Sequence, residues 1–113
     1  MRIIVCGGRD FTLKNFLYST LDKMHAANPI TCVIHGDARG ADSLAHQWAI
    51  SKGINVVPMP ADWTRYGNSA GPIRNCEMLL QAPDMVVVFR GGKGTAHMVA
   101  VARKKGVKVL EVL

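Results

Sequence analysis

Five short apolar runs alternate with segments of helical periodicity, and this alternation constrains the fold more than any other feature of the chain. The runs lie at residues 3–5, 31–34, 54–57, 85–89 and 107–112. Short apolar runs bounded by turn residues are typical of buried strands, and strands that alternate with helices form parallel sheets with helices on both faces. Because right-handed crossovers leave few topologies, we predict a Rossmann-like, doubly wound α/β sheet of about five parallel strands.

The segments between the runs carry apolar residues at helical spacing, which predicts four helices at residues 13–24, 41–49, 73–81 and 95–105. Thr12 fits the N-cap of the first helix. The stretch from Met59 to Pro72, which contains several prolines and glycines, is predicted as a long loop. Structureless loops of this length are uncommon in compact domains and are often functional. With 113 residues, the chain is predicted to form one domain over residues 1–113.

Residues with useful chemistry are concentrated in the loops that follow the predicted strands. These loops are rich in glycine, arginine and aspartate, whereas the loops that enter the strands are short and lack such residues. The carboxyl ends of parallel strands meet at one edge of the sheet, where open α/β sheets bind ligands. The sequence therefore predicts a binding site at this edge, formed by residues 7–11, 35–42, 60–67 and 90–95.

The loop Gly91–Thr95, with sequence GGKGT, is the strongest single signal for an anion. Its glycines let backbone N–H groups approach a phosphate, and the following helix presents its positive end to the same point. Thr95 either caps that helix or donates its hydroxyl group to a phosphate oxygen. The spacing is neither that of a Walker A loop nor G-x-G-x-x-G, so a plain tight turn is the alternative.

Four other residues in these loops are of interest, and two of them, Asp42 and Trp63, have two interpretations each. Asp42 stands in the first turn of a predicted helix, where it either stabilises the helix dipole or contacts a ligand. Trp63 and Tyr66 are able to stack on a base, although Trp63 alternatively folds back over the core. His35 is the only histidine that ends a predicted strand, which makes it the histidine of most interest.

Composition limits the classes of partner. The net charge of +6 and the pI near 9.6 suit an anion, either nucleic acid or a small phosphorylated ligand. Part of this charge is a basic cluster that we interpret as a solvated helix face, formed by Arg103, Lys104, Lys105 and Lys108.

Cysteine usage and hydropathy limit the classes further. The three cysteines contain no CxxC pair, so we expect neither a metal site nor a disulfide framework, and two of them fit as small core residues. We also expect no cofactor. No apolar stretch has the length of a membrane helix, and the N-terminus does not read as a signal peptide. The expectation is a cytoplasmic protein without a membrane partner.

Five stretches together resemble the SLOG superfamily, and within it the small YspA-related family. The similar patterns are GGRDF, HG-x-A-R-G-A-D, PADW, AGPIRN and GG-x-GT, matched at residues 7–11, 35–42, 60–63, 70–75 and 91–95. SLOG domains are Rossmann-like and include the Lonely Guy phosphoribohydrolases and the DNA-processing protein DprA. The resemblance extends over nearly the whole chain and implies a nucleotide-related ligand.

The comparison with Lonely Guy enzymes assigns roles to single residues. Their RKxxM stretch carries a functional arginine, so the similar stretch here, with Asn75 in place of lysine, implies a ligand or catalytic role for Arg74. In their PGGxGTxxE loop the backbone holds phosphate and the glutamate acts on the glycosidic bond. Here Arg90 replaces the proline and Met98 stands at the glutamate position, and methionine carries no charge and handles no proton. Hydrolysis would therefore need another acid, for which the options are Asp10, Asp37, Asp42, Asp62 and Glu77.

These observations lead us to predict a protein that senses or sequesters a nucleotide-derived phosphorylated small molecule, such as a nucleotide or an ADP-ribose derivative. The residues expected to contact it are Gly7, Gly8, Arg9, Gly36, Arg39, Asp62, Trp63, Arg74, Gly91, Gly92, Lys93, Gly94 and Thr95.

Two other functions are weighed against this prediction. The first is N-glycosidic hydrolysis of a nucleoside phosphate, with Arg74, Glu77 or Asp42 as the catalytic candidates. The second is binding of single-stranded nucleic acid, with Trp63 and Tyr66 as stacking residues. By analogy with relatives that pair through helices, a homodimer is also expected.

Overall fold

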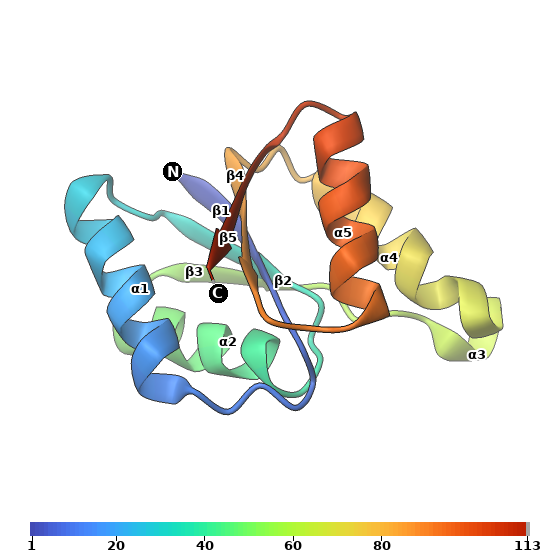
Figure 1. Ribbon diagram of the computed structural model, residues 1–113, viewed down its shortest axis with the longest axis horizontal. Coiled ribbons are helices and arrows are strands. Elements are labelled where there is room, and N and C mark those ends of the chain that lie inside the picture. The colour runs from blue at the N-terminus through green and yellow to red at the C-terminus, as the bar shows by residue number, and fades with distance from the viewer. Residues whose placement is uncertain (113) are drawn as a thin grey trace.

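The computed structural model describes residues 1–112 and contains a five-stranded sheet between two layers of helices (Figure 1). All neighbouring strands are parallel, in the order β3-β2-β1-β4-β5. This arrangement confirms the predicted Rossmann-like α/β fold. The strands are β1 (Arg2–Cys6), β2 (Cys32–His35), β3 (Asn55–Pro58), β4 (Met85–Phe89) and β5 (Lys108–Val112).

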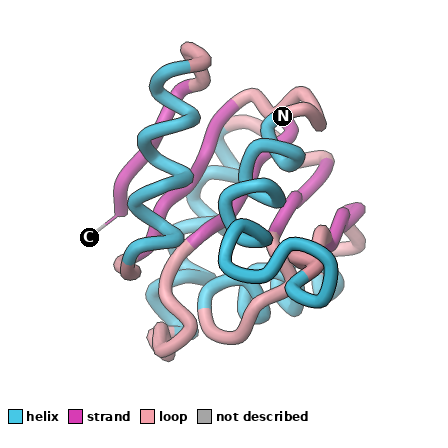
Figure 2. The backbone as a smooth tube through the Cα atoms, turned by 90° about the vertical axis from the view of Figure 1, so that its right-hand side faces the viewer, coloured by secondary structure: helices cyan, strands magenta, loops and turns pink. Residues whose placement is uncertain are grey.

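Alternate residues of the strands supply two separate cores, one on each face of the sheet. Figure 1 shows α1 (Lys14–Ala27) and α2 (Ala41–Ser51) on one face, and α4 (Ala70–Leu79) and α5 (Lys93–Lys104) on the other. Figure 2 shows the same layers after a quarter turn. In β1, Ile3 belongs to the first core and Ile4 to the second, as expected when successive side chains of a strand point to opposite faces. Burial of both faces explains why the strands read as continuous apolar runs.

The strand order reverses between β1 and β4. From β1 the chain moves outward through β2 to β3, and it then returns to place β4 on the other side of β1. The loops after β1 and β4 therefore leave the sheet in opposite directions and open a crevice at the carboxyl ends of these strands. This crevice is where the functional residues are expected.

The segment from Met59 to Pro72 is not the long loop that its prolines and glycines predict. It contains a short helix, α3 (Trp63–Tyr66), followed by a single 3₁₀ turn, η1 (Gly67–Ser69), and then the start of α4. Asp62 caps α3, because its Oδ1 accepts a hydrogen bond of 3.1 Å from the Arg65 N–H. Pro72 is tolerated as the third residue of α4, since the first N–H groups of a helix have no intrahelical partner.

Both threonines considered as N-caps lie elsewhere. Helix α1 has Leu13 as its N-cap residue, and the Thr12 carbonyl accepts from the Lys14 N–H at 2.8 Å in a tight turn before the helix. Helix α5 begins at Lys93 with Gly92 as its N-cap residue, which places Thr95 inside the first turn. The backbone enters both helices without a side-chain cap. The prediction that Thr12 is an N-cap was therefore wrong, and of the two roles considered for Thr95 the structure excludes the cap.

The other expectations about packing are met. Cys6 and Cys32 are buried core residues, whereas Cys76 is exposed on α4. The basic cluster at the end of α5 is exposed, and Arg103 forms an ion pair of 3.3 Å with Glu111. Within residues 1–112, no helix has the length and apolar character needed to cross a membrane.

Candidate functional site

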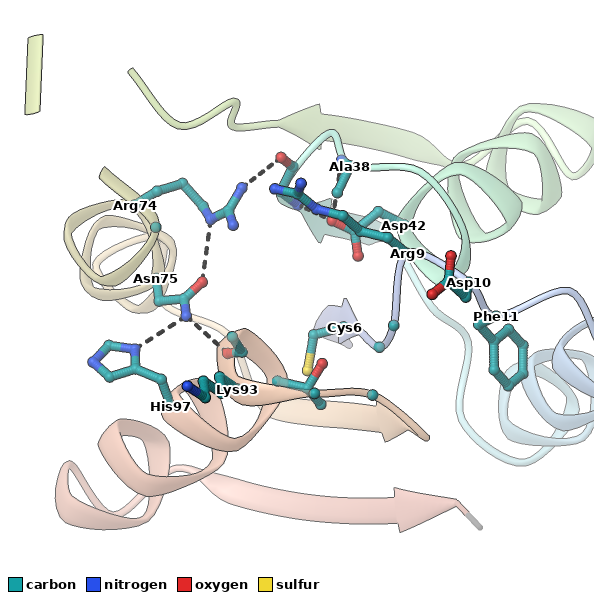
Figure 3. Close-up of a pocket in the computed structure, with 18 of the residues that line it drawn as sticks. Cys6, Arg9, Asp10, Phe11, Ala38, Asp42, Arg74, Asn75, Lys93 and His97 are labelled. Carbon is teal, nitrogen blue, oxygen red and sulfur yellow. Dashed lines mark hydrogen bonds between the residues drawn. The ribbon is translucent and has the colours of Figure 1, made fainter. Parts of the chain in front are cut away.

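A cavity of about 910 Å³ opens at the carboxyl edge of the sheet, where the strand order reverses (Figure 3). Its walls come from four places: the loop after β1, the loop after β2, the segment from α3 into α4, and the loop after β4 with the first turn of α5. A volume of this size is within the usual range for small-molecule sites, and the position is the one at which open α/β sheets bind ligands.

The loop after β4 approaches the loop after β1 so closely that a side chain is excluded. A Cβ atom added to Gly91 would collide with the Thr95 hydroxyl group and would lie 2.7 Å from the Gly8 nitrogen. The chain then enters α5, a helix of 12 residues, whose first N–H groups have no intrahelical partner and are directed at the cavity edge. Glycine at position 91 is therefore what brings the positive end of α5 to the cavity.

Gly8 connects three of the loops that form the cavity. Its N–H donates to the Arg90 carbonyl at 2.9 Å, and its own carbonyl accepts from the Phe11 N–H and the Ala41 N–H, each at 3.2 Å. The residue before Ala41, Gly40, has φ +77°, and a Cβ atom there would collide with the Gly8 carbonyl. The two glycines hold the start of α2 directly against the loop after β1.

Asp42, in the first turn of α2, is a buried carboxylate in the cavity wall. Its side chain is 6% exposed, and its Oδ2 accepts hydrogen bonds from the N–H groups of Gly36 at 3.0 Å and Ala38 at 3.3 Å. Burial raises the pKa of Asp42 to about 6, against the lowering effects of these N–H groups and of the positive charge of Arg74. A carboxyl group of this pKa changes its charge close to neutral pH.

A chain of hydrogen bonds crosses the opposite wall of the cavity, as the dashed lines in Figure 3 show. Arg74 donates to the Gly36 carbonyl and, at 3.1 Å, to Oδ1 of Asn75. The Asn75 Nδ2 donates in turn to the Gly94 carbonyl at 3.2 Å and lies 3.1 Å from Nδ1 of His97. Asn75 therefore fixes both Arg74 and the first turn of α5.

Cations outnumber carboxylates in the cavity lining. The cations are Arg9, Arg74, Arg90 and Lys93, and the carboxylates are Asp10 and Asp42. The Arg9 guanidinium lies 5.8 Å from the centroid of the Trp63 ring, which is 49% exposed at the mouth of the cavity. Trp63 does not fold back over the core, so the indole face is open to a ligand.

Two titratable residues near the site are held neutral. Burial and the charge of Asp42 raise the pKa of the Cys6 thiol to about 12, so this cavity residue stays protonated. Burial, followed by the neighbouring His46, lowers the pKa of His35 to about 4. His35 does not line the cavity: its Nδ1 accepts from the Asp37 N–H at 2.9 Å and its Nε2 lies 2.9 Å from Nδ1 of His46. His35 thus supports the loop after β2 from behind.

The structure brings most of the predicted site residues together. The cavity is lined by Gly7, Gly8, Arg9, Gly36, Trp63, Arg74, Gly91, Gly92, Lys93, Gly94 and Thr95, and by the catalytic candidate Asp42. Four residues lie outside this lining and are exposed: Arg39, Asp37, Asp62 and Glu77. Met98, at the position of the Lonely Guy glutamate, is fully buried in the core between α5 and the sheet.

Sequence reasoning missed several residues of the lining. The sequence patterns single out Asn75 only as a replacement for lysine and give no role to His97, although both line the cavity. The signal would have been the spacing of His97 from Lys93 and Gly94, four and three residues, which puts it on the same face of a helix that begins at Lys93. The loop after β1 also contributes apolar lining from Phe11 and Leu13.

Comparison with known proteins agrees with the motifs. The chain belongs to the YspA, cpYpsA-related SLOG family, YAcAr, whose pattern matches residues 1–66. It is also 35% identical over 117 residues to the Gene 61 protein of Mycobacterium phage D29, and the aligned region covers 96% of this chain and 94% of the phage protein. A comparison with solved structures finds no match. The resemblance to the YspA-related SLOG family is thus confirmed, and family membership suggests a role that involves nucleotide-related ligands.

Proposed function

We propose that this protein binds a nucleotide-derived phosphorylated small molecule in the cavity at the carboxyl edge of the sheet. The observation that carries the proposal is the meeting of the α5 N-terminus, the Gly91–Thr95 loop and the side chain of Lys93 at a cavity of about 910 Å³. Backbone N–H groups and a lysine in this arrangement suit a phosphate group. The excess of arginine in the lining favours an anionic ligand further.

The remainder of the cavity suits the other parts of a nucleotide. The exposed indole ring of Trp63 offers a stacking surface for a base, and the ring already carries Arg9 on one side. Phe11 and Leu13 add apolar contacts. The lining residues surround one cavity instead of following a groove, so a small ligand is favoured over a nucleic-acid strand, which requires cations along an extended path.

Lys93→Glu tests the phosphate position. The change places a negative charge at the start of α5, so we expect the affinity for ribonucleoside 5′-monophosphates or ADP-ribose to fall about 30-fold, equivalent to ~2 kcal/mol. Isothermal titration calorimetry measures this effect. The matched control is Lys104→Glu, an exposed lysine at the other end of the same helix, which should leave the affinity within about twofold. Equal affinity of Lys93→Glu and the wild type would show that this loop does not bind the phosphate. Absence of binding of either ligand class at millimolar concentration would contradict the proposed function.

A second candidate function, N-glycosidic cleavage of a nucleoside phosphate, is favoured by Asp42 alone. Of the carboxylates considered, only Asp10 and Asp42 line the cavity, and only Asp42 is buried, with its pKa raised to about 6. A general acid needs a pKa near the working pH. Release of free base from ribonucleoside 5′-monophosphates or ADP-ribose, lost in Asp42→Asn, would establish the activity. A stable complex in which the ligand is recovered intact would exclude it.

A further inference from the structure

One carboxylate oxygen in the cavity has no hydrogen-bond partner in the protein. Both N–H groups that contact Asp42 reach Oδ2, and no hydrogen bond to Oδ1 is formed by any residue from 1 to 112. No ion pair involves Asp42 within 4.0 Å in this part of the chain. The guanidinium of Arg74, which also lines the cavity, donates instead to the Gly36 carbonyl and to Asn75.

The free oxygen is directed to the cavity and not into the core. No fully enclosed side-chain nitrogen or oxygen atom within residues 1–112 is without a hydrogen-bond partner, so Oδ1 of Asp42 keeps access to the open cavity. Figure 3 shows Asp42 on the opposite side of the pocket from Asn75 and His97. This carboxylate oxygen borders the cavity and accepts no hydrogen bond from the described residues, so it is available to a donor group of a ligand.

The order of the loops along the sheet edge indicates which part of a nucleotide meets this oxygen. The Gly91–Thr95 loop follows β4, Gly7 and Gly8 follow β1, Asp42 lies beyond β2, and Trp63 lies beyond β3, and these strands are consecutive across the sheet. Neighbouring strands are about 5 Å apart. In space, Trp63 lies beside Arg9 of the loop after β1, whereas Asp42 stands two strands away from the phosphate-binding loop. This separation is on the order of 10 Å, which a 5′-phosphate and a sugar hydroxyl group of one nucleotide span together with their hydrogen bonds to the protein.

We propose that Oδ1 of Asp42 accepts a hydrogen bond from a sugar hydroxyl group and makes the cavity selective for ribose over deoxyribose. This inference rests on the proposed function, since it places a nucleotide in the cavity. A single free oxygen suits one hydroxyl donor, whereas the usual pairing of a carboxylate with the two N–H donors of a guanine edge needs both oxygens. The other lining carboxylate, Asp10, is exposed and does not combine burial with a free acceptor.

The test compares ribonucleotides with analogues that lack one hydroxyl group. The probe is whichever of the four common ribonucleoside 5′-monophosphates binds tightest by calorimetry, together with its 2′-deoxy and 3′-deoxy forms. For the wild type we expect at least one deoxy form to bind tenfold or more weakly. In Asp42→Asn the carboxamide oxygen keeps the contacts to Gly36 and Ala38, and the NH2 group that takes the place of Oδ1 forms at most a neutral hydrogen bond to the sugar oxygen. Because the charge-assisted bond to the carboxylate is lost, the difference should fall below about threefold. Asp10→Asn should keep the wild-type difference.

A second series uses the wild type alone, so the result does not depend on whether Asp42→Asn folds. Replacement of the discriminated hydroxyl by fluorine removes the donor and keeps the size, so the fluoro analogue should bind as weakly as the deoxy form. Recovery of ribonucleotide affinity by fluorine, deoxy forms that bind within threefold of the ribonucleotide, or full discrimination in Asp42→Asn would each overturn the inference. Failure of every ribonucleotide to bind would instead overturn the proposed function.

Discussion

The loops after β2 and β4 form two walls of the same cavity, yet they are held in opposite ways. The loop after β2 uses its polar groups internally: Asp42 accepts from two N–H groups, His35 accepts from the Asp37 N–H, and the Gly36 carbonyl accepts from Arg74. The loop after β4 is exposed from Arg90 to Gly94, and two contacts hold it, from Gly8 to the Arg90 carbonyl and from Asn75 to the Gly94 carbonyl.

Because of this difference, the loop after β2 forms a fixed wall of the cavity, whereas the loop after β4 offers hydrogen-bond donors to a ligand. In the loop after β2 the backbone N–H groups near Asp42 are occupied, so its contribution to a ligand is one carboxylate oxygen. In the loop after β4 the N–H groups at the start of α5 have no intrahelical partner and are available to an anion. Changes in the first loop should therefore act mainly on stability, and changes around the second mainly on binding.

The largest effect is expected at the tightest point of the fixed wall. In Gly40→Ala the added methyl group collides with the Gly8 carbonyl at a residue with φ +77°, so the free energy of unfolding should fall by about 3 kcal/mol or more. Urea unfolding followed by circular dichroism measures it. Gly53→Ala is the matched control, because φ is +69° there and nothing lies within 4 Å of the new atom. It should lose only about 1 kcal/mol, and equal losses in both variants would mean that the contact with Gly8 is unimportant.

The next effect concerns pH and the two buried titratable groups of the fixed wall. The unfolded chain protonates His35 below about 6.5, but the folded chain does so only below about 4, so this residue makes stability fall as pH drops between those values. Asp42 acts in the opposite sense. The folded chain protonates it below about 6 and the unfolded chain only below 3.8, so stability from this group rises as pH drops. Each contribution is on the order of 3 kcal/mol.

The opposing contributions separate in single variants. From pH 6.5 to pH 4, the wild type should gain about 2 kcal/mol relative to Asp42→Asn and lose about 3 kcal/mol relative to His35→Asn. Unfolding curves at half-unit pH steps, with each variant subtracted from the wild type, remove the contribution of the other carboxylates. A constant difference between wild type and variant across this range would show that the group is not perturbed by burial.

The smallest effect is expected at the mouth of the cavity. Trp63→Ala removes the stacking surface, so nucleotide affinity should fall about tenfold, or ~1.4 kcal/mol, with little change in stability because half of the ring is exposed. Tyr66→Ala is the control, since Tyr66 is an exposed aromatic residue on the same short helix that does not line the cavity. Similar nucleotide affinities of the two variants, measured by calorimetry, would show that the base does not stack on Trp63.

The fold could be predicted from sequence because the three buried central strands, β1, β2 and β4, leave a simple signal, and the two partly exposed edge strands, β3 and β5, still carry enough apolar residues to be recognised. Apolar runs with turn residues between them fix the strands, and the alternation with helices fixes their parallel direction. Local signals were weaker at the helix ends. Gly92, which has no side chain to act as a cap, is the N-cap residue of α5, and Pro72 lies inside the first turn of α4, where the absence of its N–H is harmless. The usual rules, that threonine caps a helix and that proline ends one, therefore fail at the start of α5 and at the start of α4.

The site could be predicted in position but not in detail. The strand ends locate the loops, but the direction of each side chain depends on packing. Arg39 and Asp42 belong to the same loop motif, and only Asp42 enters the cavity wall. Likewise, His97 and Met98 are adjacent, and a rotation of about 100° per residue places one at the cavity and the other in the core. No pattern in the chain fixed the rotation of α5 about its axis.

Gly8, with its three backbone hydrogen bonds, determines how the cavity responds to a ligand. It joins the loops after β1 and β4 and the start of α2, so these segments are tied to one another by backbone hydrogen bonds. A ligand therefore meets walls that are already assembled, and little conformational entropy is lost in ordering them. Association should follow simple one-step kinetics, in which differences among ligands lie in the dissociation rate.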